Sequence, residues 1–237
     1  MIFSIVVPLF NEEKRIDGSL NKIFDFFNSS NQQTELIFVN DGSTDRTLEK
    51  LNGYAQKFDF QVISYSQNRG KGYAVRQGAQ KASGDWILFF DIDLATPLEE
   101  FNNLLATLKD DDEVIIGSRR LPDSMIKKSE SFLRTFLGQC FTKISNLLAP
   151  GIKDFTCGFK CFSNRAAKDI FFIAKIDRWG FDTEIIFIAS LKKKKIRQMP
   201  VSWSHDTDSR VKVFGAIFTS ANDLFRIIFY YLFGYYK

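Results

Sequence analysis

Two carboxylates, two residues apart, follow the most apolar short stretch of the chain. Residues 86–90 read WILFF, and Asp91 and Asp93 come directly after them. In extended backbone, side chains at i and i+2 lean to the same side, so both carboxylates could reach one ion. Mg2+ is typically held by one or two carboxylates together with substrate phosphates. The pair predicts a divalent cation site for a phosphate-bearing ligand. A solvated turn with two incidental acids is the alternative for such a pair taken alone.

The elements that must position this pair alternate between strand and helix over residues 1–117. A short apolar run bounded by turn residues is typical of a strand buried in a parallel sheet, and the alternation predicts helices on both faces of that sheet. The expected strands are 3–9, 35–40, 61–65, 86–90 and 113–117. The expected helices are 16–27, a segment burying Leu48, Leu51, Ala55 and Phe58 with Ser43 or Thr44 as its N-cap, 73–82, and a segment marked by Leu98, Phe101, Leu105 and Leu108.

The second half of the chain has a different character. Residues 121–130 are polar and basic, which is typical of a mobile loop. We expect helices over 132–148, 181–193 and 214–231, irregular or extended backbone over 153–162, and a strand over 196–203. No internal repeat or low-complexity linker interrupts the chain, so residues 1–237 are expected to form one domain.

Composition limits the function classes. The chain has 237 residues and is 45% hydrophobic, enough for an α/β core. Its net charge of +4, from 32 basic and 28 acidic residues, is too even to indicate nucleic-acid binding. Three cysteines without CxxC spacing, and no recognisable signal peptide, favour a reducing cytosol. No run of 18 uncharged apolar residues predicts a bilayer span.

Three unusual loops are expected at one edge of the sheet. In open α/β sheets, ligands bind beyond the carboxyl ends of the strands. Residues 8–12, 41–45 and 91–93 all follow predicted strands at that edge. Asp41 could accept a hydrogen bond from a nucleobase imide or from ribose hydroxyls; alternatively, it is a turn residue ahead of a capped helix.

An ordered series of motifs resembles a known family. VPLFNEE, VNDGSTD, NRGKGYAVRQGA, FFDIDLATP and GSRR resemble family 2 glycosyltransferases of the GT-A fold. DFTCGFKCF, RWGFDTEIIFIA and VSWSHDTDSR are similar to the dolichyl-phosphate β-glucosyltransferase branch, with polyprenyl-phosphate mannosyltransferases as near relatives. The resemblance implies a Rossmann-like α/β fold with a mixed, mostly parallel sheet. It also implies a nucleotide-sugar-binding half, 1–117, and an acceptor-binding half, 118–237.

The resemblance implies roles for individual residues. Pro8, Glu12 and Asp41 would hold the nucleoside, and Asp91 and Asp93 would hold Mg2+ or Mn2+ and the diphosphate. Arg119 would bind phosphate near the acceptor, and Arg134 would be a second phosphate-binding arginine.

Charge arguments add further candidates. If the acceptor is a polyprenyl phosphate, as the resemblance implies, its phosphate monoester is largely dianionic at neutral pH and needs no general base. Because the donor also carries a diphosphate, we expect cations to crowd the site. Lys71 on the donor side and Lys160 on the acceptor side are such cations. Asp154, Asp182 and Glu184 could orient sugar hydroxyls, or act as a base for a hydroxyl acceptor, or cap helices. Asp93, Arg119 and Asp182 are the expected catalytic residues. His205, the single histidine, is expected to be a surface residue.

The C-terminal segment is expected to be an amphipathic helix. It carries many apolar residues, with tyrosines clustered at its end, a pattern typical of helices at a membrane surface. A core-packing or dimer helix is the alternative. The basic run 192–195 could lie beside anionic lipid or be a solvated helix end. Family members that span the membrane carry helices that this chain lacks, so we expect peripheral attachment at the cytoplasmic face, or a truncated chain.

Together these observations predict an inverting, metal-dependent glycosyltransferase. The expected reaction moves glucose from UDP-glucose to a polyprenyl or dolichyl phosphate. GDP-mannose as donor, or a glycan or protein hydroxyl as acceptor, is the alternative. A nucleotide-sugar-binding membrane scaffold without turnover is the alternative from another class, and the intact Asp91 and Asp93 pair disfavours it.

Overall fold

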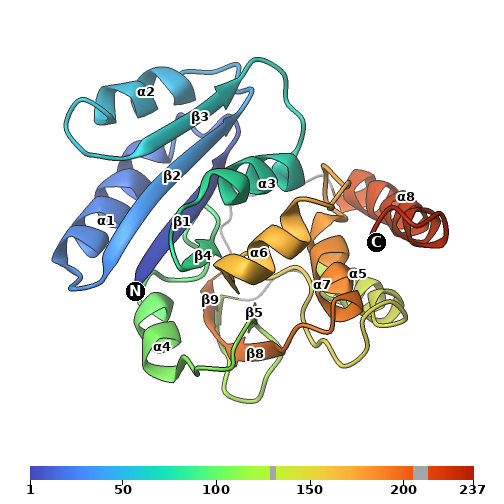
Figure 1. The fold of residues 1–237 in the computed structure, drawn as a ribbon. Coiled ribbons are helices and arrows are strands. Elements are labelled where there is room, and N and C mark those ends of the chain that lie inside the picture. The colour runs from blue at the N-terminus through green and yellow to red at the C-terminus, as the bar shows by residue number, and fades with distance from the viewer. Residues whose placement is uncertain (129–131, 205–212) are drawn as a thin grey trace.

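A computed structural model describes the chain apart from residues 129–131 and 205–212, and apart from the side chains of 128, 132–136 and 213–221. A seven-stranded sheet lies at the centre of the fold (Figure 1). Its strands, in spatial order, are β3 (Gln61–Tyr65), β2 (Gln33–Asp41), β1 (Ile2–Leu9), β4 (Trp86–Phe89), β7 (Lys160–Ser163), β5 (Val114–Ser118) and β8 (Ile196–Pro200). Only β7 runs antiparallel to its neighbours, so the sheet is mixed and mostly parallel, as expected.

Helices cover both faces of the sheet because its strands alternate apolar side chains between two cores. Ile5 and Val7 of β1 belong to one core with α1 (Ile16–Ser29), α2 (Thr47–Tyr54) and α4 (Glu100–Thr107). Val6 belongs to the other core with α3 (Lys71–Lys81), α6 (Asn164–Phe171) and α7 (Phe181–Leu191). Gly78 lets α3 approach the sheet closely, since a Cβ atom there would overlap the side chain of Val6.

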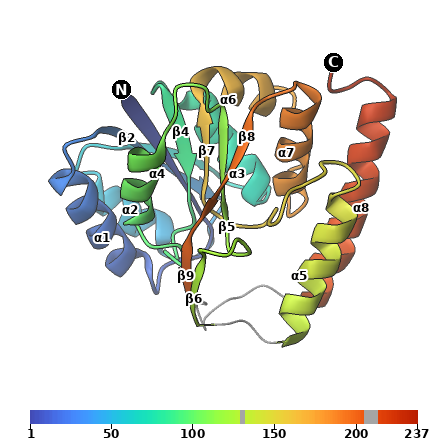
Figure 2. The same cartoon turned by 90° about the horizontal axis from the view of Figure 1, so that it is seen from below.

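Two further helices form an outer layer beyond α7. Figure 2 shows α5 (Phe132–Ser145) and α8 (Val213–Leu232) side by side at the end of the molecule away from α1. A small parallel pair, β6 (Met125–Lys128) and β9 (Ser202–Ser204), lies at the margin of the main sheet. Within the described part of the chain, no helix has both the length and the apolarity needed to cross a bilayer.

Most expected elements are present, with instructive differences. Ser43 and Thr44 are not the N-cap of α2, because that helix begins at Thr47 and both side chains bond to Asn11 instead. Ala55 follows the end of α2 and is exposed, contrary to expectation. The segment expected to be a mobile loop contains β6, and the strand expected over 196–203 divides between two sheets at Val201. Helix α6 was not predicted; Ser163 Oγ caps it by accepting from Ala166 N.

Candidate active site

The three expected loops follow β1, β2 and β4 at the carboxyl edge of the sheet, and Asp91 and Asp93 lie beyond β4. The backbone there is a turn, so the argument from extended backbone is wrong. Leu94 N donates to Asp91 O over 3.1 Å, Ala95 N donates to Asp93 Oδ1 over 3.0 Å, and Leu94 has a φ of 52°. Positive φ is rare for a residue with a branched side chain, and such strain gathers at functional sites.

The carboxylates of Asp91 and Asp93 are nevertheless close together. Burial raises the pKa of Asp93, and the neighbouring Asp91 carboxylate raises it further. Lys71 Nζ lies 2.5 Å from Asp91 Oδ1. Burial works to lower the pKa of Lys71, but the carboxylates of Asp91, Asp182 and Asp93 outweigh it and hold that pKa above its ordinary value. The turn thus concentrates negative charge around a single lysine at the start of α3.

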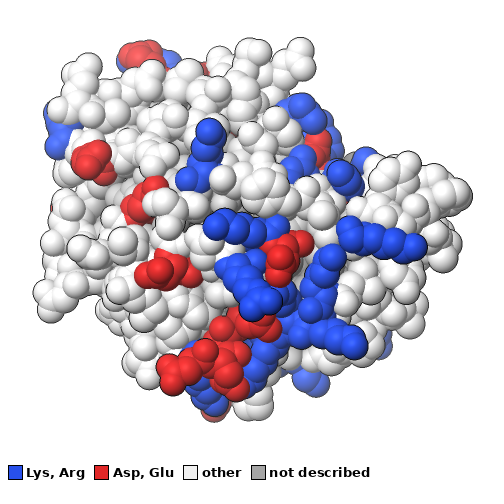
Figure 3. All heavy atoms as spheres, viewed as in Figure 1, with Lys and Arg blue, Asp and Glu red and all other residues white. Residues whose placement is uncertain are grey.

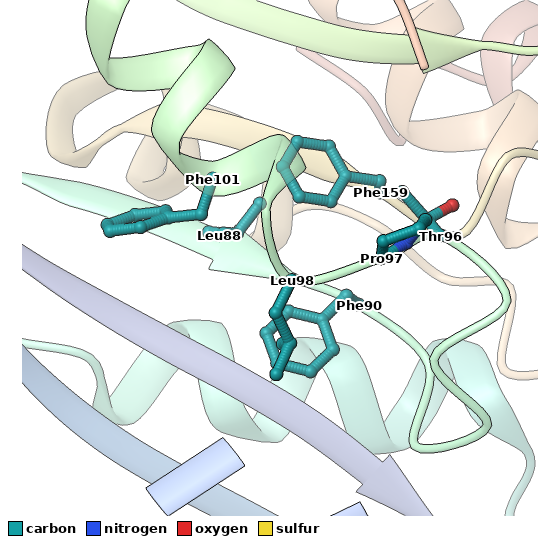
Figure 4. A pocket seen from close by; sticks show the side chains of 7 residues that line it. All are labelled: Leu88, Phe90, Thr96, Pro97, Leu98, Phe101 and Phe159. Atoms are coloured by element: carbon teal, nitrogen blue, oxygen red, sulfur yellow. The ribbon is translucent and has the colours of Figure 1, made fainter. Parts of the chain in front are cut away.

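Apolar side chains on both sides of the 91–93 turn in the sequence pack together and hold the turn in place. Figure 4 shows the side chains that line a small pocket, which come from β4 and the residue after it, from the segment 96–98, from α4 and from Phe159. The lining residues are Leu88, Phe90, Thr96, Pro97, Leu98, Phe101 and Phe159. None of them is ionisable, so the pocket anchors the carboxylate turn and does not resemble a nucleotide-sugar site.

The segment 154–160, whose last residue is the first of β7, connects this turn to two other parts of the molecule. At its first residue, Asp154 is fully buried and accepts from Arg119 Nε over 2.7 Å and Arg119 Nη2 over 2.8 Å. Burial works to raise the pKa of Asp154, but the Arg119 guanidinium outweighs it and holds that pKa well below its usual range. The Arg119 guanidinium also lies 5.3 Å from the ring of Trp203. Asp154 therefore orients Arg119 instead of facing a sugar.

The middle and the end of the 154–160 segment contact the acidic groups directly. Gly158 packs against Asp91 so closely that a Cβ atom there would overlap Asp91 Oδ2. Lys160 is 0% exposed; its Nζ donates to Asp182 Oδ1 and, over 2.6 Å, to the carbonyl of Cys157. Burial raises the pKa of Asp182 despite this partner. Lys160 holds Asp182 in place, and its buried position argues against the predicted contact with the acceptor phosphate.

The donor-side loops are bonded to one another. Asn11 N donates to Ser43 Oγ over 2.9 Å, and Thr44 N donates to Asn11 Oδ1 over 2.8 Å. Asn11 has a φ of 55°, which its short polar side chain tolerates. Glu12 pairs with Arg15 at 2.8 Å, and Pro8 is buried within β1. The roles of Pro8 and Glu12 toward a nucleoside stay predictions.

The carboxylate of Asp41 is buried and accepts hydrogen bonds from residues 68–70, in the loop between β3 and α3. It accepts from Arg69 N and Gly70 N, each over 2.8 Å, and from Asn68 Nδ2 over 2.6 Å. Gly70 has a φ of 112° and precedes Lys71. Asp41 therefore fixes the loop that delivers Lys71, and its contact with a nucleoside stays a prediction.

Three other residues lie elsewhere or outside the described side chains. Glu184 is buried and accepts from Lys175 N, Ile176 N and the hydroxyl of Tyr236, so it anchors backbone and the C-terminus. Arg134 lies in α5, but its side chain is not among those described; His205 lies outside the described residues.

Some site residues were missed by sequence reasoning. Gly158 packs against Asp91, and Asn68 donates to Asp41. Arg15 is a third such residue, because its positive charge partly opposes the rise in the pKa of Asp93. A signal was available for Asn68 and Gly158, which fall inside the quoted motifs, although no spacing rule links them to Asp41 or Asp91. Arg15 lies just beyond VPLFNEE.

The donor set suits a hard divalent cation that shares its coordination with a substrate. Asp91 and Asp93 provide neighbouring carboxylates, the oxygen ligands that such an ion prefers. Among the described residues, no group of three or more His, Cys, Asp and Glu side chains could hold a metal ion. Phosphate oxygens and water would therefore have to complete the coordination. The buried thiols of Cys157 and Cys161 have pKa values raised by burial, as expected of inert cysteines.

Known proteins share both the sequence and the fold. The family model described as glycosyl transferase family 2 matches residues 4–171. Dolichyl-phosphate β-glucosyltransferase of Dictyostelium discoideum is 34% identical over 99% of this chain and 76% of its own length. The human enzyme of the same name is 32% identical over 98% of this chain and 76% of its own length.

A solved structure supports the fold. Glucosyl-3-phosphoglycerate synthase from Mycobacterium tuberculosis, in complex with Mn2+, UDP and glucosyl-3-phosphoglycerate, superposes with a TM-score of 0.69. The match covers 95% of this chain and 79% of that chain at 17% identity, so it bears on the fold alone. The GT-A-like architecture expected from the sequence is confirmed. The chain belongs to glycosyl transferase family 2 and is a glycosyltransferase.

Proposed function

We propose that this glycosyltransferase moves glucose from UDP-glucose to a polyprenyl phosphate, with dolichyl phosphate as one such acceptor. The observation that carries the proposal is the cluster around Lys71, in which the carboxylates of Asp91, Asp93 and Asp182 meet at the carboxyl edge of the sheet. Similarity to dolichyl-phosphate β-glucosyltransferases over nearly the whole chain supports the choice of sugar and acceptor.

The charges in the cluster fit a reaction between two anions. A divalent cation held by Asp91 and Asp93 would neutralise the diphosphate of the donor as it leaves. Lys71 lies beside Asp91 and would contact the same diphosphate. Preorganised cations stabilise charge that develops in the transition state, because they need no reorganisation during the reaction.

On the acceptor side, the protein has to orient the acceptor phosphate and does not have to remove a proton from it. A phosphate monoester is already a nucleophile at neutral pH, so Asp182, paired with buried Lys160, need not act as a base. Arg119, fixed by Asp154 over two hydrogen bonds, is the group we assign to the acceptor phosphate, together with Arg134. A single displacement at the anomeric carbon then inverts an α-linked donor to a β-linked product.

The outer layer of α5 and α8 is the surface we assign to the membrane. Phe225 and Leu232 are each 73% exposed, and Ile144 and Leu147 are exposed at the end of α5. Figure 3 shows the projecting part of the surface that α8 forms as mostly uncharged, while charged side chains crowd over the neighbouring elements. Residues 132–152 contain no Asp or Glu, and 213–237 contain only Asp223, which is buried. Such a face suits anionic lipid.

The basic run 192–195 contributes less to this surface than its sequence suggests. Lys194 pairs with Glu113 and Asp169, and Lys195 pairs with Asp111. Two of the four positive charges are therefore compensated within the protein.

The decisive experiment incubates the purified chain with a panel of nucleotide sugars, a short polyprenyl phosphate, and Mg2+ or Mn2+, and analyses the extracted lipid by mass. Glucosyl lipid formed from UDP-glucose supports the proposal. Mannosyl lipid from GDP-mannose would replace the donor, and glycosylation of a soluble hydroxyl acceptor alone would replace the acceptor. Donor binding without turnover on any acceptor would favour the scaffold alternative.

A further inference from the structure

One buried carboxylate joins the outer helix α8 to the start of α7, where Asp182 lies. Asp223 of α8 is buried and accepts from Gly180 N over 3.0 Å. Gly180 is the N-cap residue of α7, two residues before Asp182. A carboxylate at a helix N-terminus satisfies a backbone N–H that the helix itself leaves unpaired, and it interacts favourably with the helix dipole.

The start of α7 packs closely against both of its neighbours, α8 and α3. A Cβ atom on Gly180 would overlap the Cβ atom of Asp223 on one side. On the other side, a Cβ atom on Gly72 of α3 would overlap the Cβ atom of Phe181. Gly72 adjoins Lys71, whose charge is balanced by Asp91 and Asp182. A displacement of Asp223 would therefore be transmitted to both sides of the charged cluster.

A second hydrogen bond fixes the segment just after α8 to the same helix α7. The hydroxyl of Tyr236, just beyond α8, donates to Glu184 Oε1 over 2.7 Å. Glu184 lies one turn after Gly180 in α7 and also accepts from Ile176 N. The position of α8 is thus set against the first turns of α7 at two points.

The two faces of α8 contact different surroundings. Leu224 and Ile227 are buried with Asp223 against the rest of the protein. Phe225 and Phe229, on the opposite side, are exposed. A lipid contact with the outer face of α8 therefore acts on the same helix whose inner face, through Asp223, holds Gly180.

We propose that Asp223 is a positioning residue that links the seating of α8 on a lipid surface to the placement of Asp182. This inference rests on the proposed function, because it assumes transfer to a lipid phosphate. Linkage requires reciprocity: if lipid contact favours the arrangement in which Asp182 is correctly placed, that arrangement also favours lipid contact. The link makes turnover depend on whether the enzyme is at a membrane.

The test measures transfer from UDP-glucose to a short, water-soluble polyprenyl phosphate, with and without phosphatidylcholine vesicles containing phosphatidylserine. Vesicles are added at concentrations that saturate binding of each variant, measured by flotation. We expect vesicles to accelerate the wild-type chain severalfold. Asp223→Ala should still reach saturated vesicle binding, retain its KM for UDP-glucose, and lose most of the acceleration in kcat.

Two variants control for structural damage. Arg226→Gln removes the 3.3 Å pair to the other oxygen of Asp223 and leaves the Gly180 bond, so its acceleration should match the wild type. Asp223→Asn keeps an oxygen that accepts from Gly180 N without the charge, so its acceleration should lie between those of the wild type and Asp223→Ala. If Asp223→Ala does not fold, Asp223→Asn carries the test alone.

The possible failures are distinguishable. Acceleration of Asp223→Ala, or of Asp223→Asn, equal to that of the wild type overturns the link. Equal wild-type rates with and without vesicles also overturn it while leaving the proposed function intact. A wild-type chain that glucosylates no polyprenyl phosphate under either condition overturns the proposed function itself.

Discussion

The donor-side loops and the outer helices α5 and α8 use their polar groups in opposite ways. In the donor-side loops, Asn11, Ser43 and Asp41 bond to backbone N–H groups of neighbouring loops, so each loop fixes the next. On the outer helices, the described contacts to α7 include only a few polar ties, such as those of Asp223 and Tyr236, and large apolar side chains face outward.

This difference indicates two kinds of binding. A loop network that is hydrogen-bonded before the ligand arrives presents a fixed geometry, as recognition of a nucleotide and a metal requires. An apolar helix face binds lipid with a strength that depends on the apolar area it buries and not on a precise fit to one ligand. Substitutions in the first region should change donor binding and chemistry, and substitutions of the outward-facing apolar side chains in the second should change association with vesicles.

The largest effect is expected for Asp154→Asn, which breaks the buried ion pair that fixes Arg119. Removing one partner of such a pair typically costs about 3–5 kcal/mol of unfolding free energy. Asp112→Asn is the matched control, because Asp112 is also buried and holds Arg197 through both carboxylate oxygens, away from the site. Urea denaturation should show similar losses for both variants, whereas only Asp154→Asn should also lose transfer at temperatures where both are folded.

The same pair predicts a pH dependence of stability. The folded-state pKa of Asp154 is lowered by Arg119, so its stabilisation is fully present above the unfolded pKa of about 3.9 and is lost as pH falls further. Denaturation at a series of pH values from about 7 down to about 2 should show the onset of this acid loss below about pH 4 in the wild type, and a smaller loss in Asp154→Asn. Equal acid losses would contradict the assignment.

A loss of transfer of about 100-fold or more is expected for Asp93→Asn, because the variant removes charge from the cation site at nearly constant volume. Mn2+ binding, followed by electron paramagnetic resonance, should weaken in parallel. Asp85→Asn is the control: Asp85 precedes β4 at its other end and accepts from Ile2 N. Undiminished Mn2+ binding by Asp93→Asn would remove Asp93 from the cation site.

Asp41→Ala should raise the KM for UDP-glucose roughly tenfold and change kcat less. The substitution removes three hydrogen bonds that hold the loop carrying Lys71, each worth about 0.5–1.5 kcal/mol in general. Glu35→Ala is the comparison, because that carboxylate also accepts several hydrogen bonds but lies on β2 away from the site. Steady-state kinetics separates the parameters; a change confined to kcat would place Asp41 with the reacting groups.

The smallest effect is expected on the outer layer. Phe229 is 50% exposed on α8, and replacing it by Ser should reduce vesicle partitioning by roughly fivefold, for a loss of about 1 kcal/mol. Phe172→Ser is the control, since Phe172 is 62% exposed at the end of α6 instead. Equal reductions in flotation for both variants would mean that α8 is not a distinct lipid surface.

The sequence predicted elements wherever an apolar pattern was long or continuous. Residues 86–90 and 16–27 are examples, and both were placed within two residues at each end. Short elements carried too little pattern: β7 has four residues, one of them the buried Lys160, and was read only as irregular or extended. Helix α6 has eight residues, and its Ser163 cap was overlooked.

The sequence predicted which residues belong to the site better than it predicted which of them contact one another. Asp91, Asp93, Lys71 and Asp182 are brought together; the charge argument called for Lys71 beside the acidic pair but did not place Asp182 there. Long-range partners could not be read from one sequence, because nothing local pairs Lys160 with Asp182 or Arg119 with Asp154. The caps expected at Ser43 and Thr44 failed for the same reason, since a distant loop competed for those side chains.

The single antiparallel strand has a consequence for how the chain can be divided. Strand β5 ends the first half in sequence, yet both of its neighbours in the sheet, β7 and β8, are encoded after it. A nascent chain that stops near residue 117 would therefore have β4 as an unprotected edge and β5 with no partner. The main sheet is therefore complete only once β8, which ends at Pro200, has been synthesised, so the strands of the first half cannot form it by themselves.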